Sequence, residues 1–107
     1  MEIDCVMVWT TIGSSTDGQN LASVLVGERL AACVNVLSEM ESVYLWKGTI
    51  ESDRERQVIM KTTTGRVPAL EARLRELHDY DVPEFVVVPI VGGSEAYLQW
   101  IRESTAG

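Results

Sequence analysis

Residues 31–64, AACVNVLSEMESVYLWKGTIESDRERQVIMKTTT, decide the fold of this chain. Residues 34–50 contain no proline and are rich in Val, Ile, Tyr and Trp, which favour a β-strand. We expect residues 51–53 to form a polar turn and residues 54–63 to return as a second strand. In that strand Val58 and Met60 share one face, and Ile59 takes the other. The segment therefore predicts one long antiparallel hairpin.

Such a hairpin is too long for a chain of 107 residues to cover. The seventeen residues 34–50 would span roughly 55 Å at about 3.3 Å each, whereas a compact domain of this size is about 35 Å across. The hairpin must therefore bend or protrude. Protruding Tyr44, Leu45 and Trp46 would form an apolar patch that monomers avoid, so we expect other copies of the chain to cover it.

The composition fits a single domain spanning residues 1–107. Hydrophobic residues make up 46% of the chain, which is enough for a compact core. Nine basic and sixteen acidic residues give a net charge of -7, and so acidic a surface repels nucleic-acid phosphates. No apolar run reaches the roughly 18 residues that span a bilayer, and the acidic first residues do not resemble a signal peptide. We expect a cytoplasmic protein that binds neither membrane nor nucleic acid.

The remaining segments alternate between strand and helix patterns. In chain order the sequence predicts a strand at residues 3–11, a helix at 16–30, the two hairpin strands, a helix after Gly65, a strand at 85–90 and a helix after Ser94. Pro89 confines the last strand to an edge or a bulge. The order βαββαβ plus a helix is that of the α+β ferredoxin-like sandwich, an antiparallel sheet with helices on one face.

Five sequence blocks follow one another along nearly the whole chain. They are ERLAACVNV at 28–36, SVYLWKGTIE at 42–51, VIMKTT at 58–63, HDYDVPEF at 78–85 and YLQWI at 97–101. In order and spacing they resemble the signature blocks of the CutA family, the divalent-cation tolerance proteins. The resemblance implies a ferredoxin-like subunit in a homotrimer, similar in architecture to the PII signalling proteins. The residues that we interpret as the trimer interface are Val43, Tyr44, Leu45, Trp46 and Trp100.

The resemblance also implies a link to copper and other divalent ions. Copper-binding members of the family carry a cysteine at the end of the first strand and two adjacent histidines before the segment that is DYDVPE here. Those positions fall on Thr10, Leu77 and His78, so only His78 is kept. An imidazole beside a carboxylate suits a divalent transition metal, and we interpret His78 and Asp79 as candidate ligands of copper or zinc. The alternative is that His78 favours the helix dipole and that the acidic residues are solvated.

A second group of residues predicts a ligand-binding cleft between subunits. Lys61 and Glu84 are charged residues flanked by apolar sequence, which indicates a cleft rim or the end of a strand. They would face a groove together with Tyr44, Tyr80 and Cys33, a ligand-pocket candidate on physical grounds. The alternative for Lys61 and Glu84 is a structural ion pair at the interface.

These features predict a small homotrimeric binding or regulatory protein linked to metal tolerance, without catalysis. Cys5 and Cys33 lie in apolar strand-like sequence, where a reduced thiol acts as a small hydrophobe. Cys33 with His78 would be a thiolate and its base only if the fold brought them together. The alternative function is a PII-like signalling trimer that holds an anionic metabolite beside Lys61 in the intersubunit cleft.

Overall fold

Four strands form one antiparallel sheet in the order β2-β3-β1-β4. A computed structural model describes residues 3–107, and its elements are β1 (Cys5–Gly13), α1 (Gly18–Gly27), β2 (Cys33–Trp46), β3 (Thr49–Thr63), a 3-10 turn (Thr64–Arg66), α2 (Val67–Leu77), β4 (Val86–Pro89) and α3 (Glu95–Thr105). Strand β3 lies between β1 and β2, which is the split βαβ arrangement. The predicted α+β class and element order are confirmed. Strand β4 is at an edge of the sheet, as Pro89 requires.

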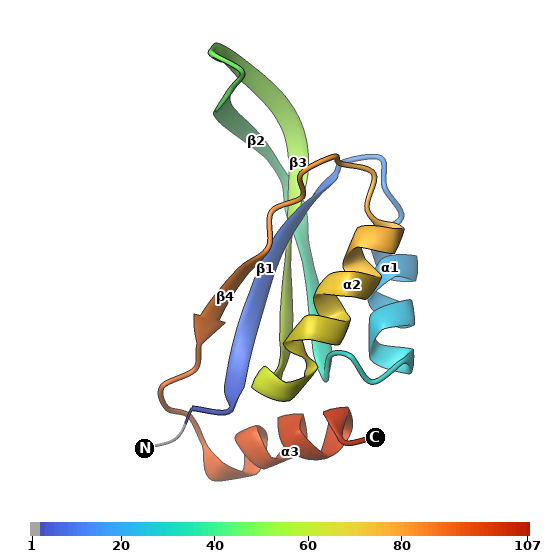
Figure 1. Cartoon of the computed structure of the whole chain (residues 1–107), viewed down its shortest axis with the longest axis vertical. Coiled ribbons are helices and arrows are strands. Elements are labelled where there is room, and N and C mark those ends of the chain that lie inside the picture. Colours follow the sequence, from blue (N-terminus) through green and yellow to red (C-terminus); the bar gives the residue numbers. More distant parts are fainter. Residues whose placement is uncertain (1–2) are drawn as a thin grey trace.

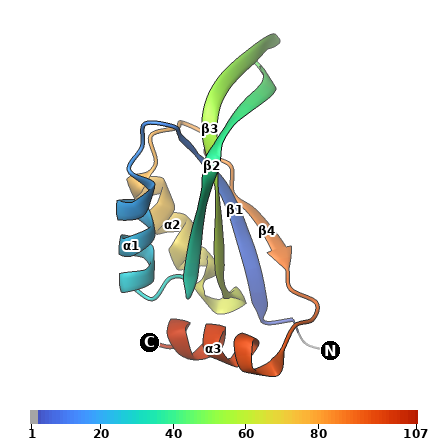
Figure 2. The ribbon, with the colours of Figure 1, turned by 180° about the vertical axis from the view of Figure 1, so that it is seen from behind.

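The core lies between one face of the sheet and two helices. Figures 1 and 2 show α1 and α2 side by side on that face, with α3 across the lower end of the sheet. Val8, Val58 and Met60 point toward the helices and are fully buried against Leu25 of α1 and Leu70 of α2. The predicted alternation along β3 is confirmed, since a strand turns successive side chains to opposite faces.

Helix α1 ends earlier than the sequence predicts, at Gly27 instead of residue 30. Arg29 adopts a left-handed conformation, with φ of 59°. Its N–H donates to the Val26 carbonyl, and the Leu30 N–H donates to the Leu25 carbonyl, both at 3.0 Å. These two bonds form a Schellman motif, which satisfies the last carbonyls and stops the helix. The conformation of Arg29 therefore sets where the chain leaves the helix for β2.

The predicted turn of the long hairpin was wrong by several residues. The loop consists of Lys47 and Gly48, with φ of 50° and 80°, and Trp46 pairs directly with Thr49. Two consecutive left-handed residues are typical of a type I′ turn, whose twist matches that of the flanking strands. The polar residues 51–53 instead continue β3. Backbone twist, and not polarity, fixes the position of the turn.

The prediction that the hairpin bends or protrudes is confirmed. Figure 1 shows β2 and β3 continuing well beyond β1 and curving away from the sheet. The register shifts between Val36 and Glu39, and such a bulge bends a strand. The molecule accordingly measures 44 × 28 × 24 Å. Residues 43–50 form the hairpin tip, in which Leu45 is 70% exposed and Ile50 is 76% exposed.

Helix α3 is held to the lower end of the sheet by a small second core and an ion pair. Ile101 is fully buried against Cys5 and Ala32. The Arg102 guanidinium donates twice to the Asp4 carboxylate, with Nε to Oδ2 at 2.6 Å and Nη2 to Oδ1 at 3.1 Å. This bidentate contact joins the start of β1 to the last turn of α3.

We predict that the Asp4–Arg102 contact makes stability depend on pH in the acid range. The hydrogen bond from Arg102 holds the pKa of Asp4 below its ordinary value of 3.8. A lowered pKa in the folded state adds stability that is fully present above about pH 5 and is lost as the pH falls below 3.8 toward the lowered pKa. Asp4→Asn should therefore lower the urea midpoint at pH 7, and the difference from wild type should shrink at pH 3. A constant difference at both pH values would contradict this.

Candidate functional site

The segment that joins α2 to β4 is fixed at its start by the His78 side chain. The ring Nδ1 accepts a hydrogen bond from the Tyr80 N–H at 3.1 Å, and Nε2 lies 2.6 Å from the carbonyl oxygen of Thr11 in β1. A nitrogen that accepts carries no proton, so Nε2 carries it and donates to Thr11. His78 therefore joins the end of α2, the end of β1 and the loop carrying Tyr80, whose ring centroid is 4.6 Å away.

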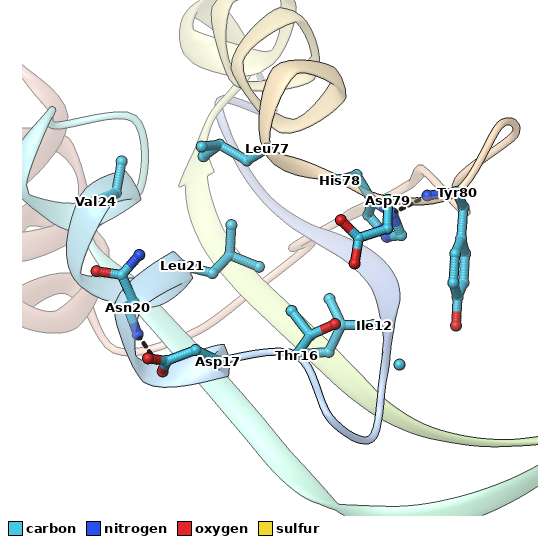
Figure 3. Close-up of a pocket in the computed structure, with 11 residues that line it drawn as sticks. Ile12, Thr16, Asp17, Asn20, Leu21, Val24, Leu77, His78, Asp79 and Tyr80 are labelled. Carbon is cyan, nitrogen blue, oxygen red and sulfur yellow. Dashed lines mark hydrogen bonds between the residues drawn. The ribbon is translucent and has the colours of Figure 1, made fainter.

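A small hollow of about 170 Å³ lies beside His78, between the end of α2 and the start of α1. Figure 3 shows Asp79 on one side of it and Asp17 and Asn20 on the other. Asp17 already caps α1, because its carboxylate accepts from the Asn20 N–H at 3.0 Å. Apolar side chains form much of the remaining wall. The volume is below that of ordinary ligand sites, which run from about 300 Å³ upward.

The residues around His78 do not fit a copper site of the kind that the resemblance implies. Thr10 is fully buried in the core, and Leu77 has no ligand atom. Across residues 3–107 the structure gathers no group of three or more His, Cys, Asp or Glu side chains suited to a metal ion. Both nitrogens of His78 are already engaged, so the ring must give up a hydrogen bond before it binds a metal. His78 with Asp79 stays a prediction that lacks a third ligand from the same chain.

A second and larger hollow, of about 440 Å³, lies where the hairpin curves over the loop that follows α2. We call it the acidic hollow, because carboxylates and aromatic rings dominate its wall. The side chains of this kind that line it are Tyr44, Trp46, Asp53, Glu55, Tyr80, Asp81 and Glu84. Among residues 3–107, no lysine or arginine lines it.

Neutral donors hold three of the carboxylates in place. The Tyr44 hydroxyl donates to Asp53, and the Tyr80 hydroxyl donates to Oε1 of Glu55 at 2.8 Å. Glu84 accepts from the side-chain amide of Gln57, also at 2.8 Å. Each contact uses one carboxylate oxygen. The acidic hollow thus keeps its negative charge while its side chains are fixed in position.

The negative environment also acts on the two phenols. The hydrogen bond to Asp53 raises the pKa of Tyr44 to about 12, with nearby carboxylates adding to the shift. Burial, followed by the hydrogen bond to Glu55, raises the pKa of Tyr80 above its ordinary value. Charge on either ring is therefore disfavoured, and both phenols remain hydrogen-bond donors at neutral pH.

The structure brings together only some of the predicted cleft residues. Tyr44, Tyr80 and Glu84 line the acidic hollow. Cys33 and Lys61 instead face each other across β2 and β3, where the Lys61 ammonium lies 5.9 Å from the ring centroid of Tyr97 in α3. Lys61 is four residues from Gln57, the partner of Glu84, or about 13 Å along the strand. Within one chain the predicted cleft is therefore split in two.

Cys33 and His78 are also separate within the chain. The Cys33 thiol contacts the Asn35 side chain at 3.7 Å and lies in the strand that does not touch β1. Both cysteines are free, and Cys5 is buried in the second core, where burial raises the pKa of its thiol. The thiol and imidazole therefore do not form a nucleophile and its base.

The sequence analysis missed Asp53, Glu55 and Gln57 as site residues, because it assigned Asp53 to a polar turn and the other two to an ordinary strand. They lie on one face of β3, because they alternate along the strand. The dipeptide Lys47–Gly48 would have pointed to these residues, because it indicates a two-residue hairpin turn. A turn at that position makes residues 51–57 part of the strand and turns these three side chains to the same side.

Comparison with known proteins agrees with this fold. The family model of the CutA1 divalent ion tolerance protein matches residues 6–104, and the chain belongs to this family. It is 43% identical over 99 residues to the divalent-cation tolerance protein CutA of Thermus thermophilus, covering 92% of this chain and 96% of that protein. It is 41% identical over 103 residues to the chloroplastic protein CutA of Arabidopsis thaliana, covering 96% of this chain and 57% of that longer protein.

Solved structures of the family superpose along nearly the whole chain. The CutA1 structure from Thermus thermophilus matches with a TM-score of 0.91 and 42% identity, covering 95% of this chain and 99% of that one. The CutA1 structure from a psychrotrophic Shewanella matches over 100% of both chains, with a TM-score of 0.93 and 34% identity. None of the helices within residues 3–107 has the length and apolar character needed to cross a membrane.

We predict that His78 stabilises the protein through its two hydrogen bonds. His78→Ala removes both, at about 1 kcal/mol each, so the free energy of unfolding should fall by about 2 kcal/mol. Asp79→Ala is the matched control, because Asp79 is exposed, and it should change stability by less than about 0.5 kcal/mol. Urea unfolding at one protein concentration measures both. Equal effects of the two substitutions would show that the His78 contacts contribute nothing.

Proposed function

We propose that this CutA1-family protein acts as a homotrimeric binding or regulatory module in divalent-cation tolerance, without catalysis. Membership of the family supports the link to divalent cations. The observation that carries the assembly is the hairpin tip, where Val43, Leu45 and Ile50 are each at least 67% exposed among the described residues. We also propose a cytoplasmic location, in keeping with two free cysteines.

A second uncovered surface supports assembly. Figure 2 shows the strands with no helix in front of them on the face opposite α1 and α2. By the strand register, Trp9 shares this face with Ile59 and Val86, and Met7 shares it with Val88. Trp100 of α3 is also exposed, at 42%. A neighbouring chain seated on this face and on the hairpin tip would bury all of these side chains in an apolar interface.

Neither alternative activity gains support from the site. Catalysis would need a nucleophile within reach of a base, and Cys33 lies away from His78. A PII-like pocket for an anionic metabolite would need basic groups, whereas the acidic hollow has none in its wall. A role in binding or regulation therefore fits this chain better than either.

We place any divalent ion between copies of the chain. No group of three ligands converges within residues 3–107, and transition metals require several. Carboxylates, the partly exposed Cys33, or a His78 ring that has given up one of its two hydrogen bonds would then complete the coordination from more than one chain. This arrangement makes metal binding depend on assembly.

The trimer predicts that a charge introduced at Leu45, which is exposed in the single chain, dissociates the assembly. Leu45→Glu should leave the subunit folded and yet dissociate the assembly, because burying an unpaired carboxylate in an apolar interface is costly. Val26→Glu is the control, since Val26 is exposed on α1, away from the hairpin. Light scattering should give about three times 11.9 kDa for wild type and for Val26→Glu. A folded wild-type monomer at micromolar concentration would overturn the trimer.

The metal proposal predicts that stabilisation by copper or zinc depends on assembly. A ligand that binds only the native state raises the melting temperature of the protein. The rise is a few degrees when the ligand concentration is well above the dissociation constant. CuCl₂ or ZnCl₂ should therefore raise the melting temperature of wild type but not of Leu45→Glu. An equal rise in both would place the site within one chain, as His78 with Asp79 would require. No rise in wild type would remove metal binding from the proposed function.

A further inference from the structure

Helix α3 covers a small core that is separate from the main one. Ile101 is fully buried against Cys5 and Ala32, whereas the main core lies between the sheet and helices α1 and α2. The buried residues of α3 itself are Ile101 and Thr105. Figure 1 shows α3 lying across the lower end of the sheet, outside the layer that α1 and α2 form. The main core would therefore stay covered if α3 moved away.

Polar contacts join the C-terminal half of α3 to the rest of the chain. Besides the bidentate contact between Arg102 and Asp4, Nε of Arg66 donates to the Thr105 carbonyl at 2.7 Å. The Thr105 hydroxyl lies 3.4 Å from that of Thr63. The side chains of Arg102 and Asp4 are 36% and 41% exposed, so water weakens their attraction. Opening of α3 should therefore require less free energy than unfolding of the whole subunit.

The segment before α3 allows the helix to move as a unit. Residues 91–94 are exposed and form neither helix nor strand. The residue before them is tied to the sheet, because the Ile90 N–H donates to the Cys5 carbonyl at 3.0 Å. A helix of 11 residues is only marginally stable in water without packing. Once α3 leaves the sheet it should therefore also unwind, which makes it a local unfolding unit.

The outer side of α3 carries an aromatic pair that the single chain leaves partly uncovered. Tyr97 and Trp100 are each 42% exposed, and their ring centroids are 5.4 Å apart. The Lys61 ammonium reaches from β3 to 5.9 Å from the centroid of the Tyr97 ring. Lys61 pairs directly with Met7 of β1 and so shares the sheet face opposite α1 and α2. The aromatic pair is therefore continuous with the face on which a neighbouring chain is proposed to sit.

We propose that α3 is a lid over Cys5 that a neighbouring copy of the chain holds closed. This inference rests on the proposed assembly. In a separated subunit, the contacts of Ile101 and Arg102 alone hold the lid, and it opens repeatedly while the sheet stays folded. In the assembly, contact between Trp100 and the neighbouring chain adds to them and keeps the lid shut. Cys5, which is 2% exposed beneath the closed lid, is therefore reached by solvent in a separated subunit.

Amide exchange of α3 in the two states of assembly tests the lid. Leu45→Glu supplies the separated subunit, and Val26→Glu is the matched control that stays assembled. The amides of residues 99–105 should exchange about tenfold faster or more in Leu45→Glu than in Val26→Glu, because no neighbour opposes opening. Within Leu45→Glu, residues 58–62 of β3 should stay better protected than α3. Equal protection of these two segments would show that α3 opens only with the whole subunit and would overturn the lid.

Two substitutions on α3 test the lid in the wild-type assembly, so that the result does not depend on the folding of Leu45→Glu. Arg102→Gln removes both bonds to Asp4 and should speed exchange of residues 99–105 severalfold, since opening must break these bonds. Glu103→Gln is the control, because Glu103 is exposed and accepts only from Gln99 of the same helix. It should leave exchange unchanged. Identical exchange in Arg102→Gln and wild type would contradict the proposal.

Alkylation by iodoacetamide measures whether the open lid exposes Cys5. Cys33→Ser leaves Cys5 as the single thiol of the chain. In that background, Leu45→Glu should be alkylated about tenfold faster than Val26→Glu, as followed by mass spectrometry without denaturant. Circular dichroism confirms that the subunit is folded during the reaction. Alkylation that is equally slow in both proteins would mean that Cys5 stays covered, and would overturn the lid.

The lid and the assembly fail in different ways. If light scattering shows a folded Leu45→Glu monomer whose α3 exchanges as slowly as β3, the lid is wrong and the trimer stands. If wild type is itself a monomer, the trimer is wrong, and the neighbour that should hold the lid closed is lost with it. Light scattering and amide exchange on the same samples therefore tell the two failures apart.

Discussion

The pairing of β2 with β3 extends beyond the sheet that supports it, and the other features of the molecule depend on this. The type I′ turn at Lys47 and Gly48 sets the length of the hairpin, and the bulge after Val36 sets its curvature. A two-stranded hairpin without a packed face is only marginally stable in water. The exposed Leu45 and Ile50 therefore require cover from outside the chain. The same curvature brings Tyr44 and Trp46 over the loop after α2 and so forms the acidic hollow.

His78 is the second constraint, and it explains why the two hollows stay distinct. Its ring joins the Thr11 carbonyl to the Tyr80 N–H, and Tyr80 in turn donates to Glu55. This chain of hydrogen bonds connects the end of α2 to the hairpin through one imidazole. Using both of its nitrogens in this way stabilises the site but leaves no free lone pair for a metal. A structural role accounts for His78 without any ligand.

Much of the fold could be predicted from the sequence, because alternation and capping are local signals. Val58 and Met60 on the buried face, the Ser94 cap and the edge position of Pro89 all follow from neighbouring residues. The turn was predicted at residues 51–53 because these residues are polar. It lies instead at Lys47 and Gly48, whose left-handed conformation depends on the twist of the flanking strands. The end of α1 was missed because a left-handed arginine is uncommon.

The candidate site was less predictable, because it depends on contacts between distant segments. Tyr44, Tyr80 and Glu84, which the sequence assigned to a cleft between subunits, line one hollow of the single chain, and each borders a conspicuous aromatic or acidic stretch. Lys61, which the sequence grouped with them in a cleft between subunits, lies apart from them in the single chain, because the strand register that separates it from Gln57 is not a local property. The engagement of His78 by Thr11 likewise joins residues 67 positions apart.

Hydrogen–deuterium exchange at the hairpin tip tests most directly whether other chains cover it. An uncovered pair of strands opens readily, and its amides exchange quickly even when they are hydrogen-bonded. Covered by neighbours, the amides of residues 43–50 should be protected to nearly the same degree as those of residues 58–62 in the central strand β3. They should lose that protection in Leu45→Glu while the central strand keeps it. Rapid exchange at residues 43–50 in the wild-type protein would contradict the account.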